Sequence, residues 1–334
     1  MRRSPRRRID GPQLKLLIVK LSSLGDVVHA MPAVQDILAA VPGARVDWVV
    51  ERGFAPLVQR CAGVHRVIPC ELRRWRKAPL AHETRVAWRA FRADLKREAY
   101  DAIIDLQGLT KSALVAHMAR LAPGGKRYAM ANRSEGSGYE APTRWVADVA
   151  VRVEPQSHAV QRSRAVCAAA LGYAPPATLR YGLGPAATQR QDCIALIHGT
   201  SRPDKCWPEA SWIELGQRLL AAGHGLALPH GNDEERERSE RLARALGPRA
   251  EVWPRLPLDA LAERLGRCAG AIGVDSGLSH IAVALDLPHV QIYNFDTAWR
   301  TGPLQGGRQR SVYAEPAPAV DAVWQAWSAL GGDS

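Results

Sequence analysis

Short runs of β-branched residues alternate with amphipathic helical stretches along almost the whole chain, and this alternation restricts the possible folds more than any other feature. The first repeat predicts a strand at Lys15–Val19, a turn at 22–26 and a helix at about 27–40. The same pattern predicts further strands at 45–50, 66–69 and 102–105. Strands that follow one another through helices lie parallel in a sheet. The sequence therefore predicts an α/β fold with parallel sheets.

A segment rich in Gly and Pro interrupts this alternation at 172–185. After it the pattern resumes, with strands expected at 193–197, 225–228, 250–252, 270–273 and 289–292. We therefore divide the chain into five parts: a basic extension (1–13), a first α/β domain (14–175), a linker (176–190), a second α/β domain (191–315) and a C-terminal helix (316–334). Two such domains place the natural ligand site in the cleft between them.

The C-terminal helix carries a continuous apolar stripe. Val320, Val323, Trp324, Trp327 and Leu330 recur at helical spacing. A stripe of this kind needs a surface to cover, and we expect the helix to cross back and pack on the first domain.

Several classes of protein are disfavoured by the sequence. No run approaches the ~18–20 apolar residues of a membrane-spanning helix. The apolar stretch 14–28 is broken by Lys15, Lys20 and Asp26 and is followed by no cleavage site, so export is not expected. The six cysteines show no CxxC spacing and the ten histidines no HExxH pattern, which predicts reduced thiols in a cytoplasmic protein without a bound metal.

Positive charge is concentrated in the first part of the chain. Residues 1–100 carry 20 Lys and Arg against 9 Asp and Glu, whereas the remaining 234 residues carry 25 against 24. This asymmetry predicts an anionic partner for the first domain, which can be nucleic acid, a membrane surface or a phosphorylated substrate; the alternative is a solubilising basic surface. Zinc-finger spacing and ribonucleoprotein motifs are absent, so nucleic acid is the least favoured partner.

The loop after the first strand holds a candidate catalytic base. Gly25 allows a tight turn, and Asp26 stands at the start of the following helix. Asp26 is either a helix cap or a base that stays ionised near the positive helix end and accepts a proton from a bound hydroxyl. His29, one turn later, is a rival or accessory group. The glycine fingerprint of a dinucleotide-binding dehydrogenase is missing after Val19.

Two loops of the second domain have the composition of a diphosphate site. His198–Lys205 offers hydroxyl groups, free amides and Lys205, although a salt bridge to a nearby carboxylate is the alternative role for that lysine. In the loop 273–280, Asp275 and Ser276 either cap a helix or bind a ligand, and Gly277 opens the backbone to close approach.

Two basic groups of residues are candidates for acceptor binding. Arg73, Arg74, Arg76 and Lys77 lie in an expected loop after the third strand. The helix expected at about 84–98 places Arg85, Arg89, Arg92 and Lys96 on one face. Such a face is commonly just solvated, but two neighbouring basic groups favour contacts with phosphate or carboxylate.

These motifs, in this order and spacing, resemble those of the bacterial ADP-heptose:lipopolysaccharide heptosyltransferases, most closely the type I members. The resemblance runs from about Leu14 to the C-terminal helix. The segments that carry it are 18–27 with His29, 47–51, 73–77, 105–109, 204–208 and 274–280.

The resemblance implies a glycosyltransferase-B fold, in which two Rossmann-like domains face each other across a cleft. It implies that Asp26 is the catalytic base and Lys205 its partner on the diphosphate. The donor-site positions that it implies are Thr200, Ser201, Lys205, Glu235, Leu256, Asp275, Ser276, Gly277 and His280. Ser276 stands where the family commonly has threonine, and Leu256 where it often has methionine. The acceptor-site positions are Ser22, Gly25, Arg73, Arg74, Arg76, Lys77, Gln107 and Lys111.

The activity that the resemblance implies is an inverting transfer of heptose from ADP-heptose to Kdo (3-deoxy-manno-octulosonic acid) of Kdo2-lipid A, without metal or cofactor. The lipid acceptor implies peripheral contact with the cytoplasmic face of the inner membrane. Addition of the second or third heptose is the nearest alternative, and a basic nucleic-acid-binding protein is the distant one.

Overall fold

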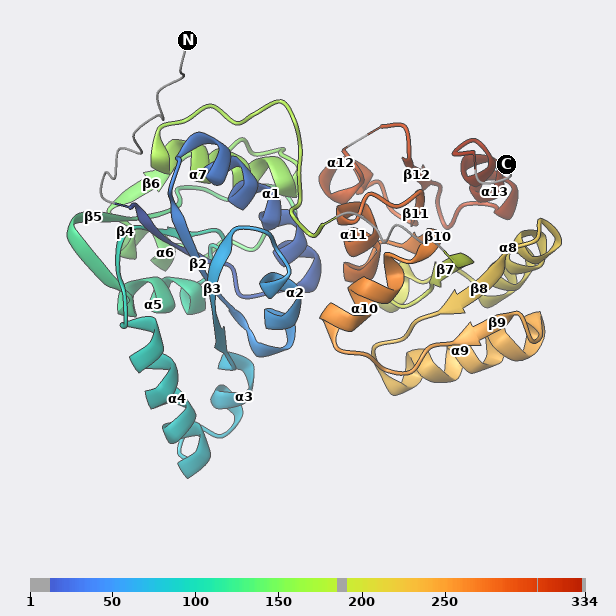
Figure 1. The fold of residues 1–334 in the computed structure, drawn as a ribbon, viewed down its shortest axis with the longest axis horizontal. Coiled ribbons are helices and arrows are strands. Elements are labelled where there is room, and N and C mark those ends of the chain that lie inside the picture. The colour runs from blue at the N-terminus through green and yellow to red at the C-terminus, as the bar shows by residue number, and fades with distance from the viewer. Residues whose placement is uncertain (1–12, 185–190, 305, 332–334) are drawn as a thin grey trace, which may run out of the picture.

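The computed structural model describes residues 13–184, 191–304 and 306–331, and it contains two α/β domains side by side (Figure 1). Each domain has a six-stranded, fully parallel sheet with helices packed on it. The strand order is β3-β2-β1-β4-β5-β6 in the first domain and β12-β11-β10-β7-β8-β9 in the second. When the strands are numbered within each domain and the second sheet is read from β9 to β12, both orders are 3-2-1-4-5-6. This is the strand order of a doubly wound dinucleotide-binding fold. The predicted fold class is confirmed.

The N-terminal domain contains the following elements in chain order: β1 (Lys15–Val19), α1 (Leu24–Ala40), β2 (Arg45–Glu51), η1 (Arg52–Phe54), α2 (Ala55–Gln59), β3 (Val64–Cys70), α3 (Leu72–Lys77), α4 (His82–Leu95), β4 (Ala99–Asp105), α5 (Thr110–Met118), β5 (Arg120–Met130), α6 (Pro142–Val146), β6 (Val149–Val151) and α7 (Ala159–Leu171). Residues 73–77, expected in a loop, form the short helix α3 because Trp75 is buried against Trp88 and Phe91 of α4.

The C-terminal domain contains β7 (Gln191–Ile197), η2 (Pro203–Lys205), α8 (Glu209–Ala221), β8 (Gly225–Leu228), α9 (Asp233–Leu246), β9 (Ala250–Val252), α10 (Leu258–Leu265), β10 (Cys268–Val274), α11 (Gly277–Ala284), β11 (His289–Tyr293), α12 (Ala298–Thr301), β12 (Gln309–Tyr313) and α13 (Val320–Ser328). Among the helices in the described ranges, none is both long and apolar enough to cross a membrane.

The innermost strands place the functional loops. β1 lies between β2 and β4, and β7 lies between β8 and β10, so each sheet reverses its winding direction at these strands. At such a reversal the connecting helices lie on opposite faces of the sheet and leave a crevice at the carboxyl ends of the strands. The loops after β1, β4, β7 and β10 therefore open onto two crevices, one in each domain.

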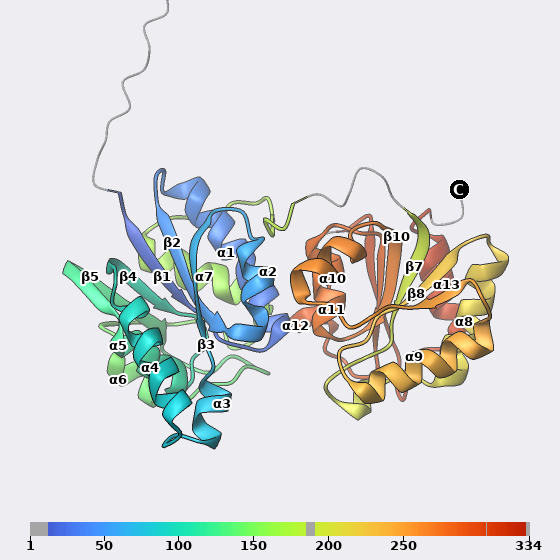
Figure 2. The ribbon, with the colours of Figure 1, turned by 60° about the horizontal axis from the view of Figure 1, so that its bottom comes forward.

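The two domains contact each other where these crevices meet. The start of α1 packs against the start of α11, and their apolar residues belong to one continuous buried cluster. The contact is close enough to require two glycines. A Cβ on Gly25 would lie 2.7 Å from Cδ2 of His280, and a Cβ on Gly277 would lie 2.7 Å from Cδ2 of Leu24. The two domains thus adjoin through helices, with α1 beside α11 and α2 beside α10 (Figure 2).

The C-terminal helix covers a different surface from the one predicted. α13 packs against β11, β12 and α8 of its own domain, and Val320, Val323 and Trp327 join the buried cluster there. The Trp327 ring fits over Gly270 of β10, where a Cβ would collide with the ring. The apolar stripe was predicted correctly, but the expectation that it crosses to the first domain was wrong, because the second sheet itself has an apolar face that this helix covers.

The predicted linker is only partly separate from the first domain. Its described residues 176–184 lie along that domain: Tyr181 and Leu183 are buried in its core, and the carbonyl of Gly182 accepts a hydrogen bond from the Ala62 amide at 2.7 Å. Residues 185–190 of the predicted linker, and the predicted extension 1–13 apart from its last residue, lie outside the described residues.

Candidate active site

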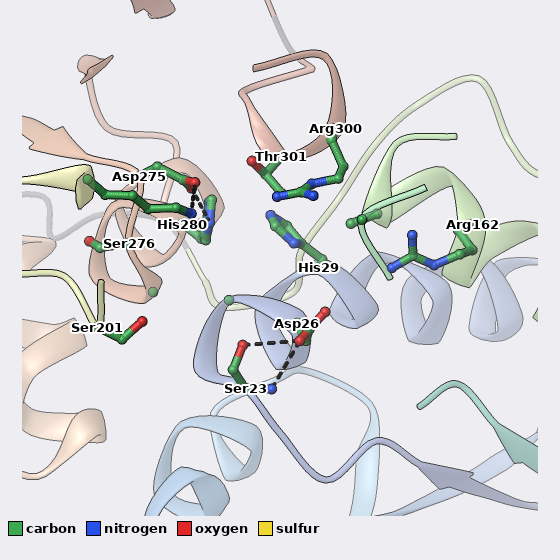
Figure 3. A pocket seen from close by; sticks show the side chains of 15 residues that line it. Ser23, Asp26, His29, Arg162, Ser201, Asp275, Ser276, His280, Arg300 and Thr301 are labelled. Atoms are coloured by element: carbon green, nitrogen blue, oxygen red, sulfur yellow. Dashed lines mark hydrogen bonds and ion pairs between the residues drawn. The ribbon is translucent and has the colours of Figure 1, made fainter. Parts of the chain in front are cut away.

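Two adjoining cavities open at the junction of the domains. The first is lined from the N-terminal domain by Gly25 and Asp26, and from the C-terminal domain by Lys205, Asp275 and other residues (Figure 3). The second adjoins it and shares its rim at Ser23, Gly25, Ser201, Ser276 and Gly277. The structure therefore brings the predicted base and the predicted diphosphate-binding lysine to one space from opposite domains.

Asp26 lies in the first turn of α1, with Ser23 as the N-cap. Its Oδ2 accepts hydrogen bonds from the Ser23 amide at 3.1 Å and the Ser23 hydroxyl at 3.0 Å, and its Oδ1 lies 3.5 Å from Nζ of Lys20. Burial on its own raises the pKa of Asp26, but the Lys20 charge and the Ser23 hydrogen bonds lower it below its ordinary value. Asp26 thus serves the helix start and also faces the cavity as an ionised carboxylate.

Lys205 forms the salt bridge that the sequence left open as an alternative. Its ammonium group pairs with Oδ2 of Asp275, whose other oxygen lies 3.4 Å from Nε2 of His280. Burial on its own raises the pKa of Asp275, but the His280 hydrogen bond and the charges of His280 and Lys205 lower it well below the ordinary range. Because all three residues also line the cavity, the salt bridge holds Lys205 toward the ligand space instead of removing it.

A row of histidines runs across the domain contact. The His29 ring of α1 lies 4.2 Å from the His280 ring of α11 and 5.8 Å from the His158 ring at the start of α7. Burial lowers the pKa of His29 well below its ordinary value, with further lowering from His280 and His158. His29 is therefore neutral at pH 7 and is part of the packing between the domains.

The second cavity combines a polar edge with an apolar wall. Its polar residues include Thr200, Ser201 and Glu235, and its apolar wall is formed by Phe54, Ile197, Leu258, Leu261 and Leu278. Its volume of about 460 Å³ lies within the range of small-molecule sites, ~300–1,000 Å³. A planar aromatic base fits such a wall, and hydroxyl groups fit the polar edge.

The polar edge is organised by two helix starts. Asn232 caps α9 and accepts from the Glu235 amide at 2.8 Å, while the Glu235 carboxylate accepts from the Gly231 amide at 2.6 Å. Ser276 caps α11, so the first amides of α11 beside Gly277 point toward the junction of the two cavities. A helix start with free amides binds an anion such as a diphosphate.

The other predicted acceptor residues fall into three groups. Arg73 lines the second cavity, whereas Arg74 pairs with Glu71 and Glu83 and, like Arg76 and Lys77, lies on the outer surface. Ser22, Gln107 and Lys111 support the loop from beneath: Gln107 Oε1 accepts from the Leu21 and Ser22 amides, both at 3.1 Å, and Lys111 donates to the Ser22 hydroxyl at 3.2 Å.

Leu256 is not brought into either cavity. It lines a separate hollow with Gln191, Ala260 and neighbouring charged residues. Its contact with a donor therefore remains a prediction.

Two arginines at the site were missed in the sequence. Arg162 of α7 and Arg300 of α12 both line the first cavity, one from each domain. Each lies in a helix with no recognisable motif around it. Because arginines are mostly exposed, the sequence alone predicts a surface position for both. The sequence held no signal that separates them from the chain's other arginines.

Two doubly wound domains that share a cavity at their junction form the glycosyltransferase-B architecture. The sequence model of glycosyltransferase family 9 (heptosyltransferase) matches residues 88–320. The chain belongs to this family.

Characterised relatives of the chain include lipopolysaccharide heptosyltransferases 1. The protein of Escherichia coli K12 is 39% identical over 290 residues, covering 84% of this chain and 88% of the relative. That of Pseudomonas aeruginosa PAO1 is 39% identical over 291 residues, covering 84% and 78%. Lipopolysaccharide heptosyltransferase 2 of Salmonella typhimurium LT2 is 25% identical over 315 residues, covering 87% and 86%.

A solved structure agrees with the sequence relatives. The E. coli heptosyltransferase WaaC with ADP matches this fold with a TM-score of 0.85 at 35% identity, covering 95% of this chain and 100% of that one. The similarity extends over both domains, so the family membership applies to the whole two-domain fold.

Proposed function

We propose that this glycosyltransferase moves L-glycero-D-manno-heptose from ADP-heptose to a Kdo residue of Kdo2-lipid A, in the assembly of the lipopolysaccharide inner core. The observation that carries the proposal is the shared cavity, in which Asp26 and Lys205 face one space from opposite domains. A sugar held there has a base on one side and a cation for the leaving group on the other.

Asp26 acts as the general base. The Kdo hydroxyl gives its proton to the Asp26 carboxylate as its oxygen attacks the anomeric carbon of the heptose. Lys20 and Ser23 hold the carboxylate ionised and oriented before the acceptor arrives. Because the base and the leaving group lie on opposite sides of the sugar, the displacement inverts the anomeric centre.

Lys205 and the start of α11 receive the leaving group. Negative charge grows on the ADP diphosphate as the glycosidic bond breaks, and preorganised donors that point at this charge lower the barrier. The Lys205 ammonium group is held by Asp275, and the α11 amides lie beside Gly277. These groups supply positive charge without a metal ion, which is why we propose a metal-independent reaction.

The second cavity receives the ADP part of the donor. Adenine fits the apolar wall of Leu258 and Leu261, and the ribose hydroxyls can donate to the Glu235 carboxylate. Two solved structures of E. coli WaaC at 35% identity support this assignment, since one holds ADP and the other ADP-2-deoxy-2-fluoro heptose.

The basic N-terminal domain is the side that meets the anionic lipid. Helices α3 and α4 extend from the β3 side of its sheet (Figure 1), and both carry arginines on their exposed faces. Leu80, between the two helices, is 88% exposed. Basic residues beside an exposed apolar side chain suit peripheral contact with an anionic membrane surface. We propose that this contact occurs at the cytoplasmic face of the inner membrane.

The first heptose is the proposed product because the similarity to the two types of relative is unequal. Identity is 37–39% to heptosyltransferases 1 but 22–25% to heptosyltransferases 2. Addition of a second heptose is the alternative that the experiment below must separate.

The test is transfer by the purified protein. ADP-heptose is incubated with Kdo2-lipid A, or with the same lipid already carrying one heptose, each with and without a chelator. We expect the mass of one added heptose on Kdo2-lipid A only, with the same rate in the chelator. Transfer only to the heptosylated lipid would assign the later step, and loss of transfer in chelator would contradict the metal-independent reaction.

A further inference from the structure

Arg162 is a buried cation that has no anionic partner among the described residues. The residue is 6% exposed, and its hydrogen bond to the Ser134 hydroxyl is long, 3.5 Å from Nη1. Within the described chain it forms no ion pair, although Arg164, on the same helix and 3% exposed, pairs with Asp36 through contacts of 2.6 and 3.2 Å. A buried arginine is costly unless its charge is matched. An external anion is the natural partner for Arg162.

The position of Arg162 restricts what this anion can be. The side chain lines the same cavity as Asp26, and the two charges attract each other across the cavity without forming a salt bridge (Figure 3). The space between them takes a molecule with a hydroxyl group for Asp26 and an anionic group for Arg162. The diphosphate of the donor has its own cation, Lys205, and helix start in the other domain. The anion at Arg162 therefore belongs to the acceptor.

We propose that Arg162 binds the carboxylate of the acceptor sugar acid. This contact positions the nucleophilic hydroxyl group of the acceptor next to the Asp26 carboxylate. This inference rests on the proposed function, because Kdo is a sugar acid whose carboxylate and hydroxyl groups share one ring. A guanidinium group is suited to this task, since it is planar and can give a carboxylate two parallel hydrogen bonds. Arg300, from the other domain, adds positive charge to the same cavity.

The test combines a substitution in the enzyme with a chemical change in the acceptor, so that four enzyme–acceptor pairs are compared. Native and Arg162→Gln enzymes are assayed with Kdo2-lipid A and with the same lipid whose Kdo carboxyl groups are converted into carboxamides. A hydrogen bond between charged partners contributes about 10- to 150-fold in affinity or rate. We expect native kcat/KM to fall by about this factor on the carboxamide, and the Arg162→Gln enzyme to treat both acceptors equally within about threefold.

Two further variants separate binding from folding. Arg162→Lys keeps the charge and should keep part of the preference for the carboxylate. Arg164→Gln removes an equally buried arginine on the same helix, so it should lower thermal stability and leave the acceptor preference unchanged. The KM for ADP-heptose should change less than about threefold in Arg162→Gln, because the contact is made with the acceptor.

The outcomes distinguish the inference from the function on which it rests. Equal losses on both acceptors in Arg162→Gln, with the native preference retained, would show that Arg162 acts only on structure and overturn the inference. A native enzyme that transfers heptose equally to both acceptors would overturn it as well. No transfer by the native enzyme to either acceptor would contradict the proposed acceptor and the carboxylate contact together.

Discussion

Replacing Asp26 with asparagine tests the base directly, because the substitution keeps the size of the side chain and removes its charge. The asparagine carbonyl can still accept from the Ser23 amide, so the start of α1 should survive. The Lys20 ammonium group loses its carboxylate but keeps its hydrogen bond to the Leu106 carbonyl at 3.0 Å. Breaking a fully buried ion pair costs about 3–5 kcal/mol. Since Asp26 is partly open to the cavity, we expect about 1–3 kcal/mol of lost stability.

The expected effect on turnover is larger. Loss of a general base reduces the rate by about 10²–10⁴-fold, which corresponds to roughly 3–5 kcal/mol in the barrier. The second cavity does not include Asp26, so the affinity for ADP should change less than about threefold. The measurements are kcat from ADP release at saturating substrates, ADP affinity by calorimetry and stability by urea unfolding.

Ser23→Ala is the matched control. It removes the hydroxyl that contacts Asp26 and costs about 1 kcal/mol as a lost N-cap, but it leaves the carboxylate in place. We expect Ser23→Ala to keep turnover within about tenfold of the native enzyme. A folded Asp26→Asn enzyme with turnover in that same range would refute the assignment of Asp26 as the base.

Three further predictions concern the donor site and stability. Glu235→Gln should weaken ADP binding about 10-fold or more in calorimetry, because a charged acceptor for the ribose is lost; unchanged affinity would exclude that contact. Trp327→Ala should lower the free energy of unfolding by about 3–5 kcal/mol, through the cavity left over Gly270, and spare acceptor affinity; a selective loss of acceptor binding would contradict the packing of α13. Burial lowers the pKa of His158, His198 and His289 to about 4, from an ordinary 6.5. Between pH 6.5 and 4 the unfolded chain thus binds more protons than the folded protein. The free energy of unfolding, measured in urea, should therefore decrease as the pH is lowered from 6.5 to 4, by up to about 1.4 kcal/mol per pH unit for each histidine. A free energy of unfolding that is constant across this range would contradict the prediction.

The strands that the sequence predicted well are those with an unambiguous pattern. β1, β8 and β9 have the predicted bounds. β1 is a run of β-branched and other apolar residues, whereas β8 and β9 are delimited by the glycines and prolines that stand before and after them. β5 was missed, since Arg120–Met130 contains Pro123, two glycines and basic residues, and it becomes a strand only through pairing with β4 and β6.

The site divides in the same way. Asp26, Lys205 and Asp275 stand in or just after loops that follow strands, and parallel strand ends gather such loops at one edge of a sheet. Their convergence could therefore be predicted. Arg162 and Arg300 stand inside helices, where the side of the helix that faces the cavity depends on how the domains pack. That packing is a tertiary property, and local patterns do not contain it.

The paired glycines where α1 meets α11 have a consequence for engineering. The proposed base belongs to one domain and the proposed nucleotide pocket to the other, and the two sheets have the same strand order. Whole domains could therefore be exchanged between relatives to change the nucleotide used. Such a chimera must preserve the seam where Gly25 meets His280 and Gly277 meets Leu24, because a single methyl group on either glycine would collide with the opposite half. Compatibility at this seam, more than the sequence of the nucleotide pocket, should decide which hybrids are active.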